Sequence, residues 1–424
     1  MQKTIYDMKK LTLIICFIIL ALNTRAAFIL IPMDNTQSNH LKAYGVAYFV
    51  LTNEVEVSWL LNYRDGSFMF PYHNIFEGEL IARGVTYQVI ADVQAASIIT
   101  QVNDPEINMS EIRLHKVPRI AVYTPPNSLP WDDAVTLALT YAEIPYDAIY
   151  DTEILNNILP IYDWLHLHHE DFTGQYGKFW FAYRETQWYR EEVRVAEEMA
   201  RRFGYKRVAD LKLEVARKIQ QFVAGGGYLF AMCSAPESID IALAAEGVDI
   251  VHEVYDGTPI EAGAQQKLDF SKTFAFHNFK IETNPYEYSK SDIDVPKTDR
   301  DQRTDFFTLF EFSAKWDPVP TMLTQNHQSV LKGFMGQTTA FRIHTVKPTV
   351  TILGETKAKN EVRYMHGAFG QGTFTFYGGH DPEDYRHYVG DPQTDLELHP
   401  NSPGYRLILN NVLFPAAKKQ KQKT

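Results

Sequence analysis

A short apolar run that ends in cysteine is the first place where the sequence indicates chemistry. A glycine turn at 225–227 leads into Tyr228–Met232, Cys233 follows, and Ser234 and Glu237 have the S-x-x-E spacing of a helix capping box. This order predicts a buried strand, an elbow and a helix start. Backbone N–H groups and the dipole at a helix N-terminus favour a thiolate. We therefore predict that Cys233 is a nucleophile, although a buried thiol at an ordinary strand-to-helix joint fits the same residues.

A second glycine turn leads through the expected strand Thr373–Tyr377 to a histidine. The glycines at 378–379 turn the chain into His380, Asp381 and Glu383. A thiol nucleophile needs a base, and the base needs an orienting carboxylate. We predict that His380 is the base and that Glu383 or Asp381 orients it. The alternative is a glycine-rich loop with a hydrogen-bonded histidine.

Histidines and acidic residues also gather at the end of the expected strand 162–167. They are His166, His168, His169, Glu170 and Asp171. Imidazole and carboxylate groups are good zinc ligands, and alternate residues of a strand point to one face. Metal sites usually draw ligands from several segments, and the sequence alone does not fix the others.

We interpret this cluster as a lining of the cleft that also holds Cys233. The predicted substrate-binding residues are His168, His169, Glu170 and Ser234. This interpretation needs no metal and no cofactor. The alternative is a metal-dependent hydrolase built on His168, His169, Glu170 and His380.

Residues 1–26 have the pattern of a secretory signal. A basic start at 8–10 precedes the apolar run Leu11–Leu22, and small residues stand at the −3 and −1 positions before residue 27. The run is shorter than the roughly 20 residues that span a bilayer. We expect an exported, periplasmic or extracellular protein, with a retained N-terminal anchor as the alternative. Because Cys16 lies in this segment, the mature chain keeps Cys233 alone and makes no internal disulfide.

The charge of the chain indicates its class of partner. The net charge of −11 becomes −14 once the four basic residues and one acidic residue of 1–26 are removed. So acidic a protein is not expected to bind nucleic acid or an anionic membrane surface. Aromatic residues, 13% of the chain, are dense at 179–189, which suits sugars or peptides as well as core packing. We expect a small-molecule or glycan substrate.

Strands and helices alternate along most of the chain, which indicates a parallel sheet covered on both faces. Expected strands are 28–32, 55–61, 120–123, 146–150, 162–167, 228–232, 306–312, 321–323, 349–353 and 373–377, and expected helical regions are 40–51, 132–142, 188–222 and 405–413. In such sheets chemistry sits at the carboxyl ends of the strands. We predict an N-terminal β-α-β unit at 27–116, an α/β domain at 117–414 with an exposed charged loop or lid at 290–305, and a basic tail at 415–424. The similar order of the first two strand-helix-strand passes hints at a duplicated unit.

The two glycine-turn strands resemble the class I glutamine amidotransferase superfamily, in which an elbow cysteine is followed downstream by a strand ending in His-Pro-Glu. Here that segment reads His380-Asp381-Pro382-Glu383, and the pair of strands also resembles the trehalose-utilisation-like branch. The resemblance covers about 119–414. It implies a three-layer α/β/α sandwich with a mostly parallel, flavodoxin-like sheet, to which the N-terminal unit is an addition. It also implies that Cys233 attacks a side-chain amide while His380 moves the proton and Glu383 orients His380.

Two departures from the motifs of this superfamily weaken the inference that this chain has glutaminase activity. Ala231 and Ala235 replace the glycines of the Gly-x-Cys-x-Gly elbow, and residues 168–171 stand where the family has a glycine-rich oxyanion loop. The resemblance therefore supports the fold more than the activity.

The whole chain also resembles an exported bacterial family that is often labelled asparagine synthetase B. That label implies an N-terminal cysteine nucleophile and a Ser-Gly-Gly-x-Asp-Ser loop, but Gln2 follows Met1 and the sequence has no such loop. ATP-dependent asparagine synthesis is therefore not expected. The leading interpretation is an exported, thiol-dependent hydrolase of amide or related bonds. A non-catalytic carbohydrate or cell-wall binding module and a metal-dependent hydrolase are the alternatives.

Overall fold

The computed structural model describes residues 26–125, 133–298, 300–388 and 390–417. The expected signal segment therefore lies outside the described residues except for Ala26, and so does the lysine-rich end of the tail. Among the described residues, no helix has the length and apolar character needed to cross a bilayer.

The N-terminal part forms a five-stranded antiparallel sheet in the order β4-β1-β3-β2-β5. Its strands are β1 (Ala26–Ile31), β2 (Val57–Leu61), β3 (Ser67–Pro71), β4 (Gln88–Ala91) and β5 (Ser110–Leu114), and its helices are α2 (His40–Thr52), α3 (Asn74–Ala82) and α4 (Asp92–Val102). Strand β3 lies between β1 and β2 and is antiparallel to both. The expected β-α-β unit is thus split by an inserted strand.

The second part is built on a ten-stranded mixed sheet. Its strands are β6 (Ile120–Tyr123), β7 (Asp147–Ile149), β8 (Trp164–Leu167), β9 (Tyr228–Met232), β10 (Phe306–Leu309), β11 (Val330–Lys332), β12 (Phe341–Arg342), β13 (Thr351–Thr356), β14 (Glu361–Phe369) and β15 (Gly372–Tyr377). The main path runs β11-β10-β13-β14-β15-β9-β8-β6-β7, and β12 pairs with β14. Strands β7, β6, β8, β9 and β15 are parallel, while β14, β13, β10 and β11 continue the sheet in antiparallel pairs. The α/β class is confirmed, with a mixed sheet.

Strands β6 and β7 pair directly, without an inserted strand. The first two strand-helix-strand passes of the chain therefore have different topologies, because β3 separates β1 from β2. The similarity of the two passes in sequence order does not extend to the sheets.

Helices bury both faces of the parallel strands. On one face, Val122 and Phe230 share a core with α5 (Ala134–Tyr141) and α14 (Pro403–Leu413). On the other face, Ala121 and Leu229 share a core with α9 (Val208–Ala224) and α10 (Ala235–Ala244). This alternation follows from the two-residue period of a strand. The remaining helices are α6 (Asp151–Leu155), α7 (Trp180–Tyr183), α8 (Gln187–Arg202), α11 (Glu253–Asp256), α12 (Ala264–Lys267) and α13 (Pro318–Leu323).

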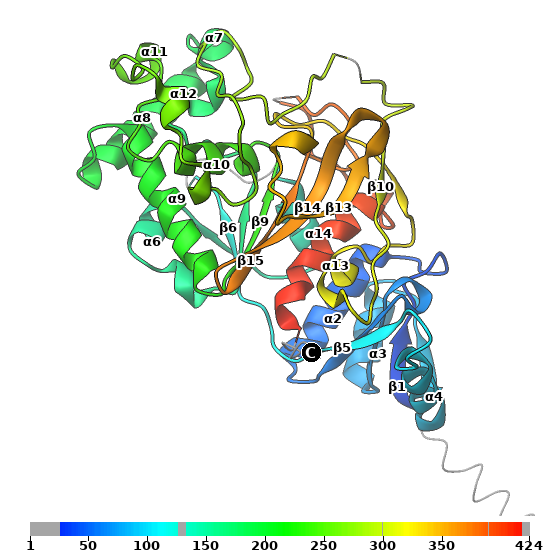
Figure 1. Ribbon diagram of the computed structural model, residues 1–424. Coiled ribbons are helices and arrows are strands. Elements are labelled where there is room, and N and C mark those ends of the chain that lie inside the picture. The colour runs from blue at the N-terminus through cyan, green and yellow to red at the C-terminus, as the bar shows by residue number, and fades with distance from the viewer. Residues whose placement is uncertain (1–25, 126–132, 299, 389, 418–424) are drawn as a thin grey trace, which may run out of the picture.

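The two sheets share a hydrophobic core. Tyr44 of α2 and Trp59 of β2 belong to the same cluster as the residues of α14. Figure 1 shows the N-terminal sheet at one end of the molecule, beside α2 and α14. The N-terminal part is therefore joined to the larger sheet by packing as well as by the chain.

Two predicted elements are wrong or incomplete. The expected strand 321–323 is the end of helix α13, which begins at Pro318 with a proline suited to the first turn. The expected helical region 188–222 is two helices, because the chain turns at Gly204 with a φ of 82°.

The predicted exposed lid at 290–305 is also wrong. Lys290, Asp294, Arg300 and Asp305 are buried. The guanidinium of Arg300 lies 3.0 Å from Asp305 and 2.7 Å from Glu361, so the charges are compensated inside the fold. Part of the charge in this segment is therefore paired inside the fold, whereas the ion pair of Arg303 with Asp301 is exposed.

Candidate functional site

The candidate site lies at the carboxyl ends of four neighbouring parallel strands. Asp133 follows β6 at the start of α5, His168 directly follows β8, Cys233 directly follows β9, and His380 follows β15. Parallel strands bring such positions to one edge of the sheet. The structure therefore brings together groups that are far apart in the sequence, as we predicted for Cys233 and the His168 cluster.

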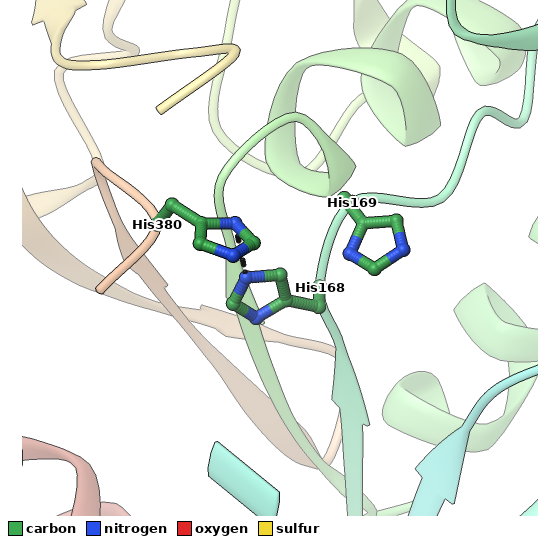
Figure 2. Close-up of side chains that lie close together, drawn as sticks. All are labelled: His168, His169 and His380. Carbon is green, nitrogen blue, oxygen red and sulfur yellow. Dashed lines mark hydrogen bonds between the residues drawn. The ribbon is translucent and has the colours of Figure 1, made fainter. Parts of the chain in front are cut away.

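Three imidazoles form a cluster at this edge (Figure 2). The Nε2 atom of His168 lies 2.8 Å from Nδ1 of His380, and the two rings are perpendicular with centroids 4.3 Å apart. The ring of His169 lies with its centroid 5.3 Å from that of His168. One ring nitrogen of each histidine lies within 4.8 Å of the other two. His168 and His380 are buried, whereas His169 is exposed, so the cluster has one side toward solvent.

A buried carboxylate lies behind this cluster. Asp133 contacts Nε2 of His166 at 3.0 Å and Nδ1 of His168 at 3.5 Å, and its Oδ1 also accepts the backbone N–H of Val135 at 2.7 Å. Burial alone would raise the pKa of Asp133, but the imidazole of His166, which is also hydrogen-bonded to it, holds that pKa well below its usual range. Asp133 is therefore an anion that starts helix α5, is hydrogen-bonded to His166 and lies close behind His168.

His168 is in the form that a metal ligand needs. Burial holds the pKa of His168 well below its usual value, so the ring is neutral and keeps a lone pair. A carboxylate on the remote nitrogen of a ligating histidine is the usual outer partner in zinc sites. The ring of His387 stacks on His380 at 4.2 Å between centroids and limits how that imidazole turns.

The spacing of the imidazoles fits a tetrahedral ion. With Zn–N bonds of about 2.0–2.1 Å, neighbouring ligand nitrogens lie about 3.3 Å apart. The nitrogens of His168 and His380 are 2.8 Å apart, so they need to separate by only about half an ångström. A proton shared between two ring nitrogens is what an ion replaces. The separation of His168 and His380 is therefore close to that of two ligands of one ion, and a nitrogen of His169 lies within 4.8 Å of both.

Cys233 forms the elbow that the sequence predicted. Its φ is +54°, a left-handed conformation that costs energy for a residue other than glycine and is common at functional sites. Its N–H donates to the carbonyl of Gly379 at 3.1 Å, which ties the elbow to the segment carrying His380. The thiol is 2% exposed, and burial raises its pKa. We predicted a lowered pKa from the helix start; the burial of the thiol outweighs that effect.

A cover segment, residues 334–339, encloses the thiol. The N–H of Gln337 donates to Sγ of Cys233 at 3.2 Å, and the side chain of Gln337 donates to the carbonyl of Gly177 at 2.6 Å. Arg363 donates to the carbonyls of Phe334 and Thr339 at 3.0 and 3.2 Å. The cover segment is thus anchored at both ends.

The capping box predicted from Ser234 and Glu237 does not form. The hydroxyl of Ser234 donates to the carbonyl of His169 at 3.0 Å, and the carboxylate of Glu237 accepts from the hydroxyls of Ser291 and Thr338 at 2.6 Å each. Ser234 is fully buried, so it positions His169 and does not face a substrate. This corrects its predicted substrate-binding role.

The two predicted orienting carboxylates have other contacts. Glu383 lies 3.2 Å from Nδ1 of His399, and Asp381 accepts the hydroxyl of Thr394 at 2.8 Å. Their orienting role toward His380 stays a prediction. Asp133 was not among the predicted site residues, although an acidic residue between an expected strand and an apolar helix is typical of a helix N-cap at this edge.

Glu170 directly follows His169 in the chain. It is half-buried, and burial raises its pKa. Its backbone carbonyl accepts the hydroxyl of Ser238 at 2.7 Å, which fixes the chain at this point. Its position next to the exposed imidazole keeps the predicted substrate-facing role open.

Comparisons with known proteins give no family. No family model and no curated protein matches the chain. Among solved structures, it is similar to the cytoplasmic proteins STM3548 and STM1381 of Salmonella typhimurium, at 10% and 11% identity and TM-scores of 0.35 and 0.36, over 71% of this chain and all of each of theirs. It is also similar to a catalytic mutant of Gan42B, a GH42 beta-galactosidase from G. stearothermophilus, at 13% identity and a TM-score of 0.25, over 62% of this chain and 27% of that one. TM-scores this low support no conclusion about function, so the function has to be inferred from the residues of the site.

Proposed function

We propose that this chain is a metal-dependent hydrolase whose ion is held by His168, His169 and His380. The observation that carries this proposal is the approach of three imidazole nitrogens to within 4.8 Å of one another at the carboxyl edge of the sheet. The exposure of His169 gives a substrate access, and the buried anion of Asp133 supports His168 from behind.

The expected reaction is hydrolysis of an amide or related acyl bond. A divalent ion at such a centre polarises a carbonyl oxygen and lowers the pKa of water. Asp133 lies 3.5 Å from Nδ1 of His168 and places a negative charge behind that ring. Glu170 directly follows His169 in the chain, and we expect its carboxyl group to be the acid–base group of this reaction.

Metal content and activity test this proposal together. The protein is stripped with a chelator, reloaded with zinc, and measured for bound metal and for hydrolysis of nitrophenyl esters and anilides. We expect one tightly bound ion for each chain, its loss in His168→Ala and His380→Ala, and no loss in His344→Ala, which removes an exposed imidazole. A native protein without tight zinc, or a His380→Ala variant that keeps it, would contradict the proposal.

The second candidate is the thiol hydrolase with an amidotransferase-like fold. The strand order β7-β6-β8-β9-β15 corresponds to 2-1-3-4-5, which supports a flavodoxin-like, three-layer core for this part of the chain. The left-handed φ of Cys233 supports the elbow of that superfamily. In this candidate His380 is the base, and the cover segment must move before a substrate reaches the thiol.

The Cys233→Ala variant separates the two candidates. A metal-dependent hydrolase keeps its activity in this variant, whereas a thiol hydrolase loses it. Mass spectrometry of the native protein during turnover adds a second criterion, because a covalent acyl adduct on Cys233 indicates the thiol route.

Export, with cleavage after residue 26, remains part of the proposal. The mature N-terminus of the secreted protein, read by mass spectrometry, tests it, and a chain that retains residues 1–26 contradicts it.

A further inference from the structure

Large aromatic side chains are exposed on α7, on α8 and in residues 286–288. We define the aromatic rim as Trp180, Phe181, Trp188, Tyr286 and Tyr288. The exposed fractions of Phe181, Trp188, Tyr286 and Tyr288 are 52%, 39%, 60% and 45%. A gathering of exposed apolar groups is unfavourable in water and marks binding grooves or interaction sites.

The rim brings together two segments that are far apart in the sequence. The ring of Tyr286 lies 5.8 Å from that of Trp180 and 5.1 Å from that of Phe181. Phe179 lies 5.6 Å from Tyr288 and 5.8 Å from Trp188 and so joins the rest of the rim. Helix α7 and residues 286–288 therefore form one continuous surface.

A cavity of about 240 Å³ opens beside this surface. It is lined by Tyr176, Trp180, Arg184, Tyr189, Arg190 and Tyr255, among others. Its volume is below the roughly 300–1,000 Å³ of pockets for drug-sized ligands, so it suits a single ring of a larger molecule. Ring faces and guanidinium N–H groups together match a ring that carries hydroxyl groups.

The charge in the cavity is balanced. The guanidinium of Arg184 lies 3.9 Å from Glu185 and 4.9 Å from the centre of the Trp180 ring. Arg190 also pairs with Glu185. The arginines thus offer hydrogen-bond donors while their charge is partly neutralised, which favours a neutral ligand over an anion.

The rim is connected to the imidazole cluster. The chain passes from His168 and His169 to helix α7 within a dozen residues, and the Gln337 side chain of the cover segment binds the carbonyl of Gly177 between them. Figure 1 shows α7 above α10, the helix that follows β9 and Cys233. A polymer seated on the rim therefore lies on the side of the molecule where the imidazole cluster is.

We propose that the aromatic rim binds a neutral saccharide and that the substrate is an acylated one, cleaved at its ester or amide bond. This rests on the proposed hydrolase. Water adds its hydroxyl to the acyl carbon, the bond from that carbon to the sugar oxygen or nitrogen breaks, and the sugar atom takes the proton. Glycosidic bonds are usually cleaved by two carboxylic acids that flank the bond, whereas polarisation of a carbonyl by an ion suits an acyl group.

Binding is tested by affinity electrophoresis in native gels that contain deacetylated xylan, laminarin or, as an anionic comparison, alginate. We expect retardation by at least one neutral polysaccharide and about tenfold weaker binding in Trp180→Ala and Tyr286→Ala. Trp316→Ala is the matched control, because Trp316 is 80% exposed and lies outside the rim. Three results would overturn the saccharide assignment. They are no retardation in either neutral gel, unchanged binding in both rim variants, and binding to phosphatidylcholine vesicles alone.

Hydrolysis is tested separately by acetate release from acetylated xylan and from acetylated chito-oligosaccharides. We expect the zinc-loaded protein to release acetate from at least one of them. The His380→Ala variant should still be retarded in the gel but release no acetate. If the zinc-loaded protein binds saccharide but releases no acetate, the proposal of an acylated substrate is wrong and the proposal of saccharide binding at the rim still holds. If the protein hydrolyses small esters but is not retarded by saccharide, the proposal of saccharide binding at the rim is wrong and the proposed hydrolase function still holds.

Discussion

Cys233 and the imidazole cluster occupy the same edge of the large sheet, but their surroundings differ. The cluster has an exposed member, His169, and a buried anion, Asp133, behind it. The thiol is enclosed by the cover segment, and burial raises its pKa. Position at a strand end thus presents a group for chemistry, while the loops packed against that end decide whether the group reaches a substrate.

Loss of the residue that anchors the cover segment should have the largest effect on the difference between the enclosed thiol and the accessible imidazole cluster. Arg363 is buried, lies 2.6 Å from Asp305 and holds two carbonyls of the cover segment. We expect Arg363→Met to lower the free energy of unfolding by about 3–5 kcal/mol, because a buried ion pair loses one partner. Chemical denaturation measures this loss, and alkylation of native Cys233 should become faster. Arg303→Met, at an exposed ion pair, should change stability by less than about 0.5 kcal/mol.

The support of the imidazole cluster is tested by Asp133→Asn. Asparagine still starts a helix well, so the fold should persist. Because the carboxylate behind His168 becomes neutral, zinc affinity should fall by about 10–100-fold. Competition with a fluorescent chelator measures this change. An affinity equal to that of the native protein would remove Asp133 from the metal site, and Asp395→Asn, at an exposed N-cap, serves as the control.

The alkylation rate of Cys233 tests directly whether the cover segment keeps the thiol from reagents. Since burial raises the pKa of Cys233 and the cover segment encloses it, alkylation by iodoacetamide at pH 7 should be about tenfold slower than in the unfolded chain. The adduct is followed by mass spectrometry, with and without denaturant. Rapid modification of the native protein would mean that the thiol is accessible and would favour the thiol hydrolase.

A smaller effect is expected from Asp294, whose carboxylate accepts the N–H of Thr339 in the cover segment at 2.8 Å. Burial raises the pKa of Asp294 to about 7, against the opposing charge of Lys297, so the folded chain holds a proton that the unfolded chain releases. Stability from this group is therefore full near pH 4 and is lost as the pH rises toward 7. We expect Asp294→Asn to flatten this part of the pH profile, by up to about 1.4 kcal/mol for each pH unit. Thermal unfolding between pH 4 and 7 measures it, and an unchanged slope would contradict the assignment.

Local patterns predicted the elements that carry the site. The apolar runs after two glycine turns are β9 and β15, and the residues that follow them, Cys233 and His380, stand at the expected edge. These signals are local, because a strand and its turn are encoded by neighbouring residues. The expected helix at the end of the chain is α14 for the same reason.

Long-range pairing explains what the sequence analysis missed. Nothing near His168 indicates that its partner is His380, and the acidic residue behind it, Asp133, lies before a different helix. The charged residues of 290–305 were expected to be exposed to solvent, because Glu361 on β14, the partner of Arg300, is distant in the sequence. The thiol pKa was predicted in the wrong direction, since the cover segment that buries Cys233 has no local signal in the elbow.

The backbone around the elbow has a practical consequence for inhibitor studies. The N–H of Cys233 is bonded to Gly379, next to His380, and the N–H of Ala235 is bonded to the carbonyl of His168 at 3.0 Å. A bulky adduct on the sulfur needs the space that the cover segment fills, and these backbone bonds link the elbow to both histidine-bearing chains. Inactivation by a sulfhydryl reagent would therefore not by itself identify a cysteine enzyme.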